Sequence, residues 1–162
     1  GLEGLCSVPG RLECVGSYNG AYIFVDFAHT PDGLEKSLAS LKKLCKGKLY
    51  CLFGCGGNRD STKRPLMGKV AAEYADFCII TSDNPRYEDP YDIISQIEEG
   101  LRPSGKAYVT VTDRQTATEY AVRLLKEGDI LLVAGKGGEN YQEVMGIKHS
   151  YSDNTVIKNI IG

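Results

Sequence analysis

The sequence predicts an α/β fold built on a doubly wound, mainly parallel sheet with helices on both faces. Two patterns carry this prediction. Short runs rich in Ile, Leu, Val and Phe alternate along the chain with longer stretches whose apolar residues recur at helical spacing. The short runs are continuously apolar, as strands buried on both faces of a parallel sheet require.

The pattern assigns five strands, which we expect at residues 22–25, 49–53, 77–81, 108–111 and 130–134. Four helical stripes lie between them, with apolar positions at Leu34, Leu38, Leu41 and Leu44; Leu66, Val70 and Tyr74; Ile93, Ile94, Ile97 and Leu101; and Ala117, Ala121, Leu124 and Leu125. Thr30 and Asp113 are suited to begin helices, because their side chains accept hydrogen bonds from the first turn. A Gly-rich loop and a polar stretch follow the fifth strand, and a last helix is expected at 153–160.

The length of 162 residues is enough for one domain with a substantial core. We expect this domain to span 13–162, while 1–12 does not fit the unit and is expected to end a preceding domain or form a linker. The net charge of −2 offers no basic surface for nucleic acid or an anionic membrane. No apolar run approaches the roughly 20 residues of a membrane span, and no secretory signal begins the chain. A cytoplasmic location is the expectation.

The six cysteines and two histidines do not form a metal-binding pattern. No two cysteines are spaced as C-x-x-C, and His29 and His149 are far apart along the chain. Cys51 and Cys78 lie in strand-like runs, where a thiol behaves as a small hydrophobic group. We therefore expect reduced thiols and no metal site in this chain.

Four loops that follow predicted strands carry unusual polar sequences, at residues 26–32, 54–64, 83–86 and 135–139. Because the carboxyl ends of parallel strands meet at one edge of a sheet, these loops are expected to lie together. Their charged residues include Arg59, Arg64, Asp83, Arg86, Lys136 and Glu139. This mixture of charges suits a zwitterionic ligand with carboxylate and ammonium groups, beside a phosphate.

The loop Asp83-Asn84-Pro85-Arg86 is the most informative of the four. Pro85 fixes its own φ and biases Asn84 away from helix, so the backbone of the loop is stiff. A guanidinium presented from such a loop is suited to hold a carboxylate through two parallel hydrogen bonds. Alone, the tetrapeptide would be an ordinary turn with a surface arginine, and the other three loops make the binding interpretation the better one.

The glycine-rich loops do not form a complete nucleotide site. Neither G-x-x-x-x-G-K-[ST] nor G-x-G-x-x-G occurs in the chain, so it has no self-sufficient triphosphate cradle. The segment 54–64 is either a ligand-facing loop with open amides or a solvated connection. His29 is either a base or nucleotide contact, or part of a structural segment that caps the next helix through Thr30-Pro31.

Six segments, in the right order, resemble the C-terminal domain of the Mur ligase family over nearly the whole chain. They are Pro9-Gly-Arg-Leu-Glu13, Val25-Asp-Phe-Ala-His-Thr-Pro-Asp32, Phe53-Gly-Cys-Gly-Gly-Asn-Arg-Asp60, Lys63-Arg-Pro-Leu-Met-Gly68, Asp83-Asn-Pro-Arg86 and Ala134-Gly-Lys-Gly-Gly-Glu139. The resemblance implies a Rossmann-like, doubly wound sheet of six strands, one more than the apolar pattern gives.

The resemblance implies the third domain of a monomeric, three-domain ligase of bacterial peptidoglycan synthesis. That enzyme would use ATP and Mg²⁺ to join meso-diaminopimelate, or a close diamino diacid such as lanthionine, to UDP-N-acetylmuramoyl-L-Ala-D-Glu. The N-terminal and central domains of the same polypeptide would hold the UDP-sugar and the ATP. This chain alone would bind the amino acid without catalysing the reaction and without binding ATP or Mg²⁺.

The resemblance also implies which residues would line the pocket for the diamino acid: Arg59, Asp83, Asn84, Pro85, Arg86, Gly135 and Glu139. Arg86 would grip the distal carboxylate with Asn84 beside it. Glu139 would take the distal ammonium, and Arg59 would help to hold the remaining carboxylate. The positions that would approach the nucleotide are Arg11, Asp26 and His29. No catalytic or metal-binding residue is assigned to this chain.

Two positions depart from the family pattern. Gly138 stands where the family usually has histidine, and Phe27 stands where tyrosine is common. Two other functions stay open: the equivalent domain of a ligase that adds another amino acid, and a non-catalytic binding module of the same fold. Arg86 argues against a lysine-adding ligase, because lysine lacks the distal carboxylate and would leave a desolvated guanidinium unpaired.

Overall fold

The structure is a computed structural model that describes residues 12–162. The segment expected to precede the domain, 1–12, lies outside the described residues except for Leu12, whose side chain packs against the core. Within the described part, no helix is long and apolar enough to cross a membrane.

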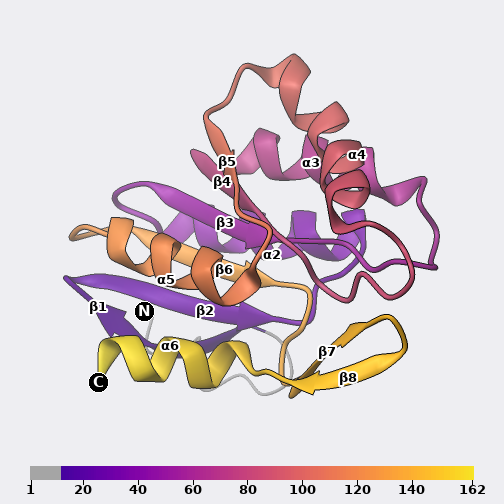
Figure 1. Ribbon diagram of the computed structural model, residues 1–162. Coiled ribbons are helices and arrows are strands. Elements are labelled where there is room, and N and C mark those ends of the chain that lie inside the picture. Colours follow the sequence, from indigo (N-terminus) through magenta and orange to yellow (C-terminus); the bar gives the residue numbers. More distant parts are fainter. Residues whose placement is uncertain (1–11) are drawn as a thin grey trace.

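The centre of the fold is a six-stranded sheet in the order β1-β2-β6-β3-β4-β5 (Figure 1). Its strands are β1 (Glu13–Tyr18), β2 (Ala21–Asp26), β3 (Leu49–Phe53), β4 (Phe77–Ile80), β5 (Tyr108–Thr110) and β6 (Ile130–Ala134). Strand β1 pairs with β2 in the antiparallel sense, and all other pairs are parallel. The mainly parallel, six-stranded sheet is therefore confirmed, as are the five strands that the apolar runs predicted.

Helices cover both faces of this sheet, as the doubly wound fold requires (Figure 1). They are α2 (Pro31–Leu44), α3 (Lys63–Tyr74) and α4 (Pro90–Leu101) on one face, and α5 (Arg114–Leu124) and α6 (Asp153–Ile161) on the other. A short 3₁₀ turn, η1 (Arg102–Ser104), follows α4. Successive residues of each strand enter opposite cores: Phe24 packs beneath α2, whereas Ile23 packs beneath α5.

The connection pattern creates a switch point at β6. The chain runs from β2 to β3, β4 and β5 in one direction, with α2, α3 and α4 on one face, and then returns across the other face through α5 to β6. Strand β6 therefore lies between β2 and β3, and the loops that leave neighbouring strands here turn to opposite faces. Ligands of open α/β sheets bind at such a point.

Helix starts follow the capping chemistry of the sequence. Thr30 accepts a hydrogen bond from the backbone of Gly33, and Asp113 accepts one from that of Thr116. Both caps were predicted from residue type. Asp89 and Ser152 begin α4 and α6 in the same way.

The pattern of apolar residues did not predict two β-hairpins. Strand β1 joins β2 through Asn19 and Gly20, with φ of 52° and 81°, which is the backbone that an Asn-Gly hairpin turn requires. The polar stretch after β6 forms a separate two-stranded sheet, β7 (Tyr141–Val144) with β8 (Ile147–Ser150). The Asn-Gly pair was a visible signal for the first hairpin, whereas the second has little apolar alternation.

A buried ion pair joins the two helices of one face to the strand ends. Arg114, the first residue of α5, donates from Nε and Nη2 to the two carboxylate oxygens of Asp153, at 2.9 and 2.8 Å. Its Nη1 and Nη2 also donate to the backbone oxygens of Ser82 and Ala134, both at 3.1 Å. Neither charged side chain is exposed. Tyr151 adds a hydrogen bond to the carboxylate at 2.9 Å.

Burial alone would raise the pKa of Asp153, but the charge and hydrogen bonds of Arg114, with the hydrogen bond from Tyr151, outweigh it and lower that pKa. An aspartate with a lowered pKa in the folded state stabilises the fold above its unfolded-state pKa. That stabilisation is lost as the pH falls from the ordinary value of 3.8 through the folded-state pKa.

We expect Asp153→Asn to lower the free energy of unfolding by about 3–5 kcal/mol at neutral pH, because it leaves the Arg114 cation buried without a counter-charge. Denaturant titration measures this loss, and repeating it at decreasing pH should give a difference between wild type and variant that shrinks below about pH 4.

The control is Arg102→Ala, which removes the exposed partner of the Arg102–Glu98 ion pair. Exposed pairs of this kind contribute about 0–1 kcal/mol. If Asp153→Asn costs no more than this control, the buried pair is not a main source of stability.

Candidate functional site

A cleft of about 470 Å³ opens at the carboxyl edge of the sheet. Its lining comes from the loops after β2, β3, β4 and β6: Phe27, His29, Thr30, Gly56, Arg59, Asp60, Lys63, Asp83, Asn84, Arg86, Gly135 and Glu139. The four loops singled out in the sequence therefore do meet in one place, at the switch point of the sheet.

The cleft gathers most of the residues that the sequence assigned to a ligand. Those that line it are His29, Arg59, Asp83, Asn84, Arg86, Gly135 and Glu139. Two do not line it, Pro85 and Asp26, and both are buried. Arg11 lies outside the described residues.

The loop 83–86 is held in an unusual backbone conformation. Arg86 has a φ of 54°, in the left-handed region that residues other than glycine rarely adopt. Two backbone hydrogen bonds to the β7–β8 hairpin hold it there: Arg86 N donates to Glu143 O at 3.1 Å, and Met145 N donates to Arg86 O at 2.8 Å. The polar stretch of the sequence therefore supports the loop.

The Arg86 guanidinium is held along one side by protein groups. Its Nη1 donates to the backbone oxygen of Gly57 at 3.0 Å, and its Nε lies 3.3 Å from Oε1 of Glu143. The side chain is 15% exposed and lines the cleft. A cation in this half-buried position is suited to bind a ligand carboxylate.

Lys136, which the sequence grouped with the ligand-facing charges, does not line the cleft and is the centre of a buried polar network. Its ammonium lies 2.8 Å from Asn84 Oδ1, 2.9 Å from Tyr141 O, 3.3 Å from Asp83 Oδ1 and 3.5 Å from Glu139 Oε1. Its side chain is fully buried. This single cation joins the loops after β4 and β6 to strand β7. A lysine between glycines after a buried strand was the available signal.

Asp83 and Asn84 are further fixed by the β7 strand. Gln142 Nε2 donates to the backbone oxygen of Asp83 at 2.8 Å, and Glu143 N donates to Oδ1 of Asn84 at 2.9 Å. Asn84 O in turn accepts from Gly57 N at 2.8 Å, which ties in the loop after β3. Both side chains are almost fully buried, so their positions are set before any ligand arrives.

Glu139 keeps unused hydrogen-bonding capacity at the cleft. Its Oε1 is buried and has no hydrogen-bond partner in the described part of the chain, with only the 3.5 Å ion pair to Lys136 nearby. Oε1 is closed to a ligand, but the side chain is 23% exposed and lines the cleft, so the other carboxylate oxygen is the one suited to receive an N–H group from a ligand.

Glycine is needed at 135 and is not needed at 138. Gly135 has a φ of 111°, and a side chain there would meet the Asp83 carboxylate. By contrast, no atom lies within 4 Å of where a Cβ at Gly138 would be. The departure from the family pattern at 138 leaves Glu139 at the cleft, where its backbone N–H donates to Lys136 O at 2.9 Å.

Arg64 has a structural role, although its sequence position grouped it with the ligand-facing charges. Its side chain is fully buried, and it donates to both carboxylate oxygens of Glu88, to Gln96 and to the backbone oxygen of Gly56. It thereby anchors the loop after β3. Arg59, which lines the cleft, is exposed and donates only to Asn58 O among the described residues.

Asp26 and His29 are both engaged with neighbouring backbone. The Asp26 carboxylate accepts hydrogen bonds from Phe27 N and from the Ser37 hydroxyl. The Nδ1 of His29 lies 2.9 Å from Phe27 O, and Lys63 Nζ donates to His29 O at 2.7 Å. His29 and Lys63 nevertheless line the cleft with their side chains at its rim.

Within residues 12–162, no cysteine lines this cleft. Burial raises the pKa of Cys55 and of Cys78 to about 12, and it raises the pKa of Cys51 as well. A thiol with so high a pKa carries almost no thiolate at neutral pH. Within residues 12–162 no group of three or more His, Cys, Asp or Glu side chains is arranged to hold a metal ion.

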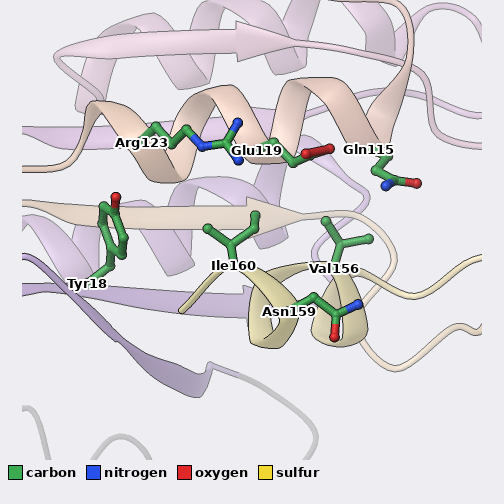
Figure 2. A pocket seen from close by; sticks show the side chains of 7 residues that line it. All are labelled: Tyr18, Gln115, Glu119, Arg123, Val156, Asn159 and Ile160. Carbon is green, nitrogen blue, oxygen red and sulfur yellow. The ribbon is translucent and has the colours of Figure 1, made fainter. Parts of the chain in front are cut away.

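A second, smaller cleft of about 300 Å³ lies between α5 and α6 (Figure 2). It is lined by Tyr18, Gln115, Glu119, Arg123, Val156, Asn159 and Ile160. None of the residues that the sequence assigned to a ligand contributes to it. The convergence of loops and charges distinguishes the cleft at the sheet edge from this one.

Comparisons with known proteins identify relatives of this chain. The chain is 47% identical over 155 residues to UDP-N-acetylmuramoyl-L-alanyl-D-glutamate--2,6-diaminopimelate ligase of Syntrophomonas wolfei, covering 95% of this chain and 32% of that protein. A solved structure of a ligase with the same name matches with a TM-score of 0.89 at 40% identity, covering 95% of this chain and 31% of the other.

A more distant structure, FolC of E. coli in complex with ADP, matches with a TM-score of 0.62 at 19% identity, covering 94% of this chain and 31% of that one. It supports the fold alone. The chain spans about a third of the length of the curated relatives that it matches.

The family described as "Mur ligase, glutamate ligase domain" matches residues 10–137. This match covers most of the chain and includes the loops after β2, β3 and β4 and the first three residues of the loop after β6. The chain therefore belongs to the Mur ligase family, as the C-terminal domain of such a ligase.

Proposed function

We propose that this chain binds the incoming amino acid in an ATP-dependent ligase of peptidoglycan synthesis. The complete enzyme would join meso-diaminopimelate, or a close diamino diacid such as lanthionine, to UDP-N-acetylmuramoyl-L-Ala-D-Glu. The observation that carries this proposal is the cleft in which Arg86, Arg59 and Glu139 converge. The name of the relative from S. wolfei supports the choice of substrate.

The charges of the cleft match the ends of a diamino diacid. Arg86 is a half-buried cation suited to the distal carboxylate, with the side chain of Asn84 fixed beside it. The Glu139 carboxylate, whose Oε1 faces Lys136, is suited to accept the distal ammonium through its other oxygen. Arg59, exposed on the opposite loop, is available for the remaining carboxylate. Asp83 and Gly135 shape the wall between them.

ATP and Mg²⁺ would be held mainly by another domain of the same polypeptide. The sequence has no phosphate-loop motif, and the described residues have no cluster of metal ligands. Of the residues expected near the nucleotide, His29 lies at the rim of the cleft, where it would approach ATP bound from outside. ATP would activate the substrate carboxylate. This chain would hold the attacking amine in line with it and exclude water from the cleft.

We expect Arg86→Ala in the complete ligase to raise the KM for diaminopimelate by about 10- to 100-fold, the equivalent of losing one charge-assisted contact of about 1.5–3 kcal/mol. The KM for ATP should change by less than about threefold, since Arg86 is not assigned to the nucleotide. Steady-state kinetics with each substrate varied in turn measures both values.

Arg102→Ala is the matched control, because Arg102 is an exposed arginine after α4 and does not line the cleft. An unchanged KM and kcat for diaminopimelate in Arg86→Ala would remove Arg86 from the site and contradict the proposed function.

Glu139→Gln should keep the shape of the loop but remove the charge that faces the distal ammonium. We expect the preference for diaminopimelate over 2-aminopimelate, which lacks one amine, to fall by about tenfold in inhibition of the complete ligase. Comparing the ratio of the two inhibition constants in wild type and variant tests this. An unchanged ratio would show that Glu139 does not contact the ammonium.

The 162-residue chain alone should neither hydrolyse ATP nor form the amide bond, because it lacks a triphosphate cradle. Release of phosphate from ATP, measured with the purified chain and both substrates, tests this expectation. Steady turnover by the purified chain, free of contaminating ATPase, would contradict it.

A further inference from the structure

We propose that Glu143 is a positioning residue for Arg86 and thereby a determinant of selectivity for a ligand with a distal carboxylate. This inference rests on the proposed function, in which Arg86 binds that carboxylate. Glu143 lies on β7, in the polar stretch whose sequence gave no functional signal, and it does not line the cleft. Its contact with the ligand would therefore be through Arg86.

The backbone of Glu143 is aligned with the loop 83–86 at two points. Its N–H donates to Asn84 Oδ1 at 2.9 Å, and its C=O accepts from Arg86 N at 3.1 Å. Val144 and Arg86 also form an isolated parallel bridge. These bonds fix the position of the Glu143 backbone relative to Arg86. Because they use only backbone atoms of residue 143, they should persist when its side chain is replaced.

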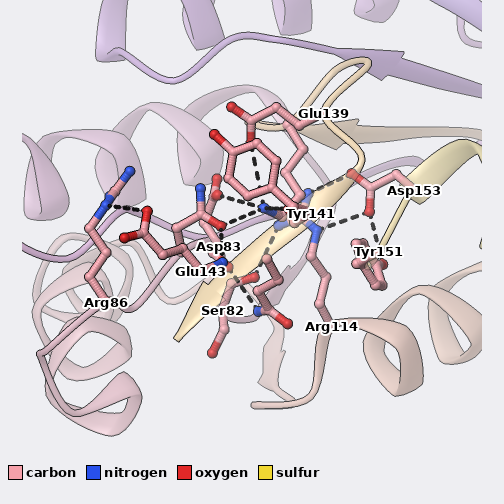
Figure 3. Close-up of polar contacts among 12 residues, drawn as sticks. Ser82, Asp83, Arg86, Arg114, Glu139, Tyr141, Glu143, Tyr151 and Asp153 are labelled. Atoms are coloured by element: carbon pink, nitrogen blue, oxygen red, sulfur yellow. Dashed lines mark hydrogen bonds and ion pairs between the residues drawn. The ribbon is translucent and has the colours of Figure 1, made fainter. Parts of the chain in front are cut away.

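The Glu143 carboxylate then occupies one edge of the guanidinium. Its Oε1 lies 3.3 Å from Arg86 Nε, and the side chains of Glu143 and Arg86 are 23% and 15% exposed. Figure 3 marks this ion pair with a dashed line. Gly57 O accepts from Nη1, so the protein engages the guanidinium at two of its three nitrogens. Nη2 has no hydrogen-bond partner within residues 12–162, and together with the second N–H of Nη1 it forms the fork suited to a carboxylate.

An arginine without such a partner would sample many rotamers and would have to lose that freedom on binding. Glu143 also balances the charge of Arg86, because its carboxylate forms an ion pair with that guanidinium. The Glu143 carboxylate therefore has two effects. It orients the free edge of the Arg86 guanidinium toward the cleft, and it favours ligands whose carboxylate matches the geometry of that edge.

The test compares Glu143→Ala and Glu143→Gln with Arg86→Ala in the complete ligase. We expect Glu143→Ala to raise the KM for diaminopimelate by about 3- to 10-fold, the effect of releasing one ordered side chain. Glu143→Gln keeps an acceptor oxygen and should show a smaller rise. The KM for ATP and inhibition by lysine, which has no distal carboxylate, should stay within about twofold of the wild type.

The double variant Arg86→Ala/Glu143→Ala should bind diaminopimelate no more weakly than Arg86→Ala alone, because Glu143 acts through Arg86. Glu73→Ala, an exposed glutamate at the far end of α3 from the cleft, is the matched control. Thermal unfolding of each variant separates a folding defect from a positioning effect.

The outcomes separate this inference from the proposed function. If Arg86→Ala impairs use of diaminopimelate but Glu143→Ala does not, only the positioning role is overturned. The role is also overturned if the increases in the KM for diaminopimelate caused by the two single substitutions multiply in the double variant. It is likewise overturned if Glu143→Ala weakens the binding of lysine and of ATP as much as that of diaminopimelate. If Arg86→Ala itself has no effect, the carboxylate site of the proposed function and this inference both fail.

Discussion

The buried ion pair between Arg114 and Asp153 is the interaction on which the rest of the site depends. Arg114 holds the backbone oxygens of Ser82 and Ala134, which are the last residues before the loops that begin at 83 and 135. Asp153, at the start of α6, fixes the guanidinium that does this. The pair therefore sets where two of the four cleft-forming loops leave the sheet, and it connects that position to helices on one face.

Lys136 is a second buried cation, and it lies in one of the loops that form the cleft. Its ammonium contacts oxygen atoms of the loops after β4 and β6 and of β7. Asp83 and Glu139 together balance its charge. Buried charges are tolerated only when they are paired in this way. The cleft is therefore preorganised, with groups such as Asn84 oriented by the protein and Glu139 and Arg86 left with capacity for a ligand.

The sequence predicted the sheet and its helices well because two-sided burial leaves a strong signal in continuous apolar runs such as 130–134. It also predicted that four loops would meet, since parallel strands share a carboxyl edge. It did not reveal β7 and β8, whose residues are partly or fully exposed and carry little alternation. Nor did it show that Arg64 is structural whereas Arg86 faces the cleft. Residue type does not tell whether a guanidinium pairs with a carboxylate of the protein, as Arg64 does with Glu88, or is free to bind a ligand.

The open space around Gly138 has a practical consequence for spectroscopy. A cysteine placed there would stand free of neighbouring atoms on the same loop as Glu139, in a backbone conformation that L residues adopt. The native thiols of Cys51, Cys55 and Cys78 are buried with raised pKa values and would compete poorly for a maleimide dye. The other three cysteines, Cys6 and the half-buried Cys14 and Cys45, would first be replaced by serine. A fluorophore attached at position 138 would therefore report directly on events at the mouth of the cleft.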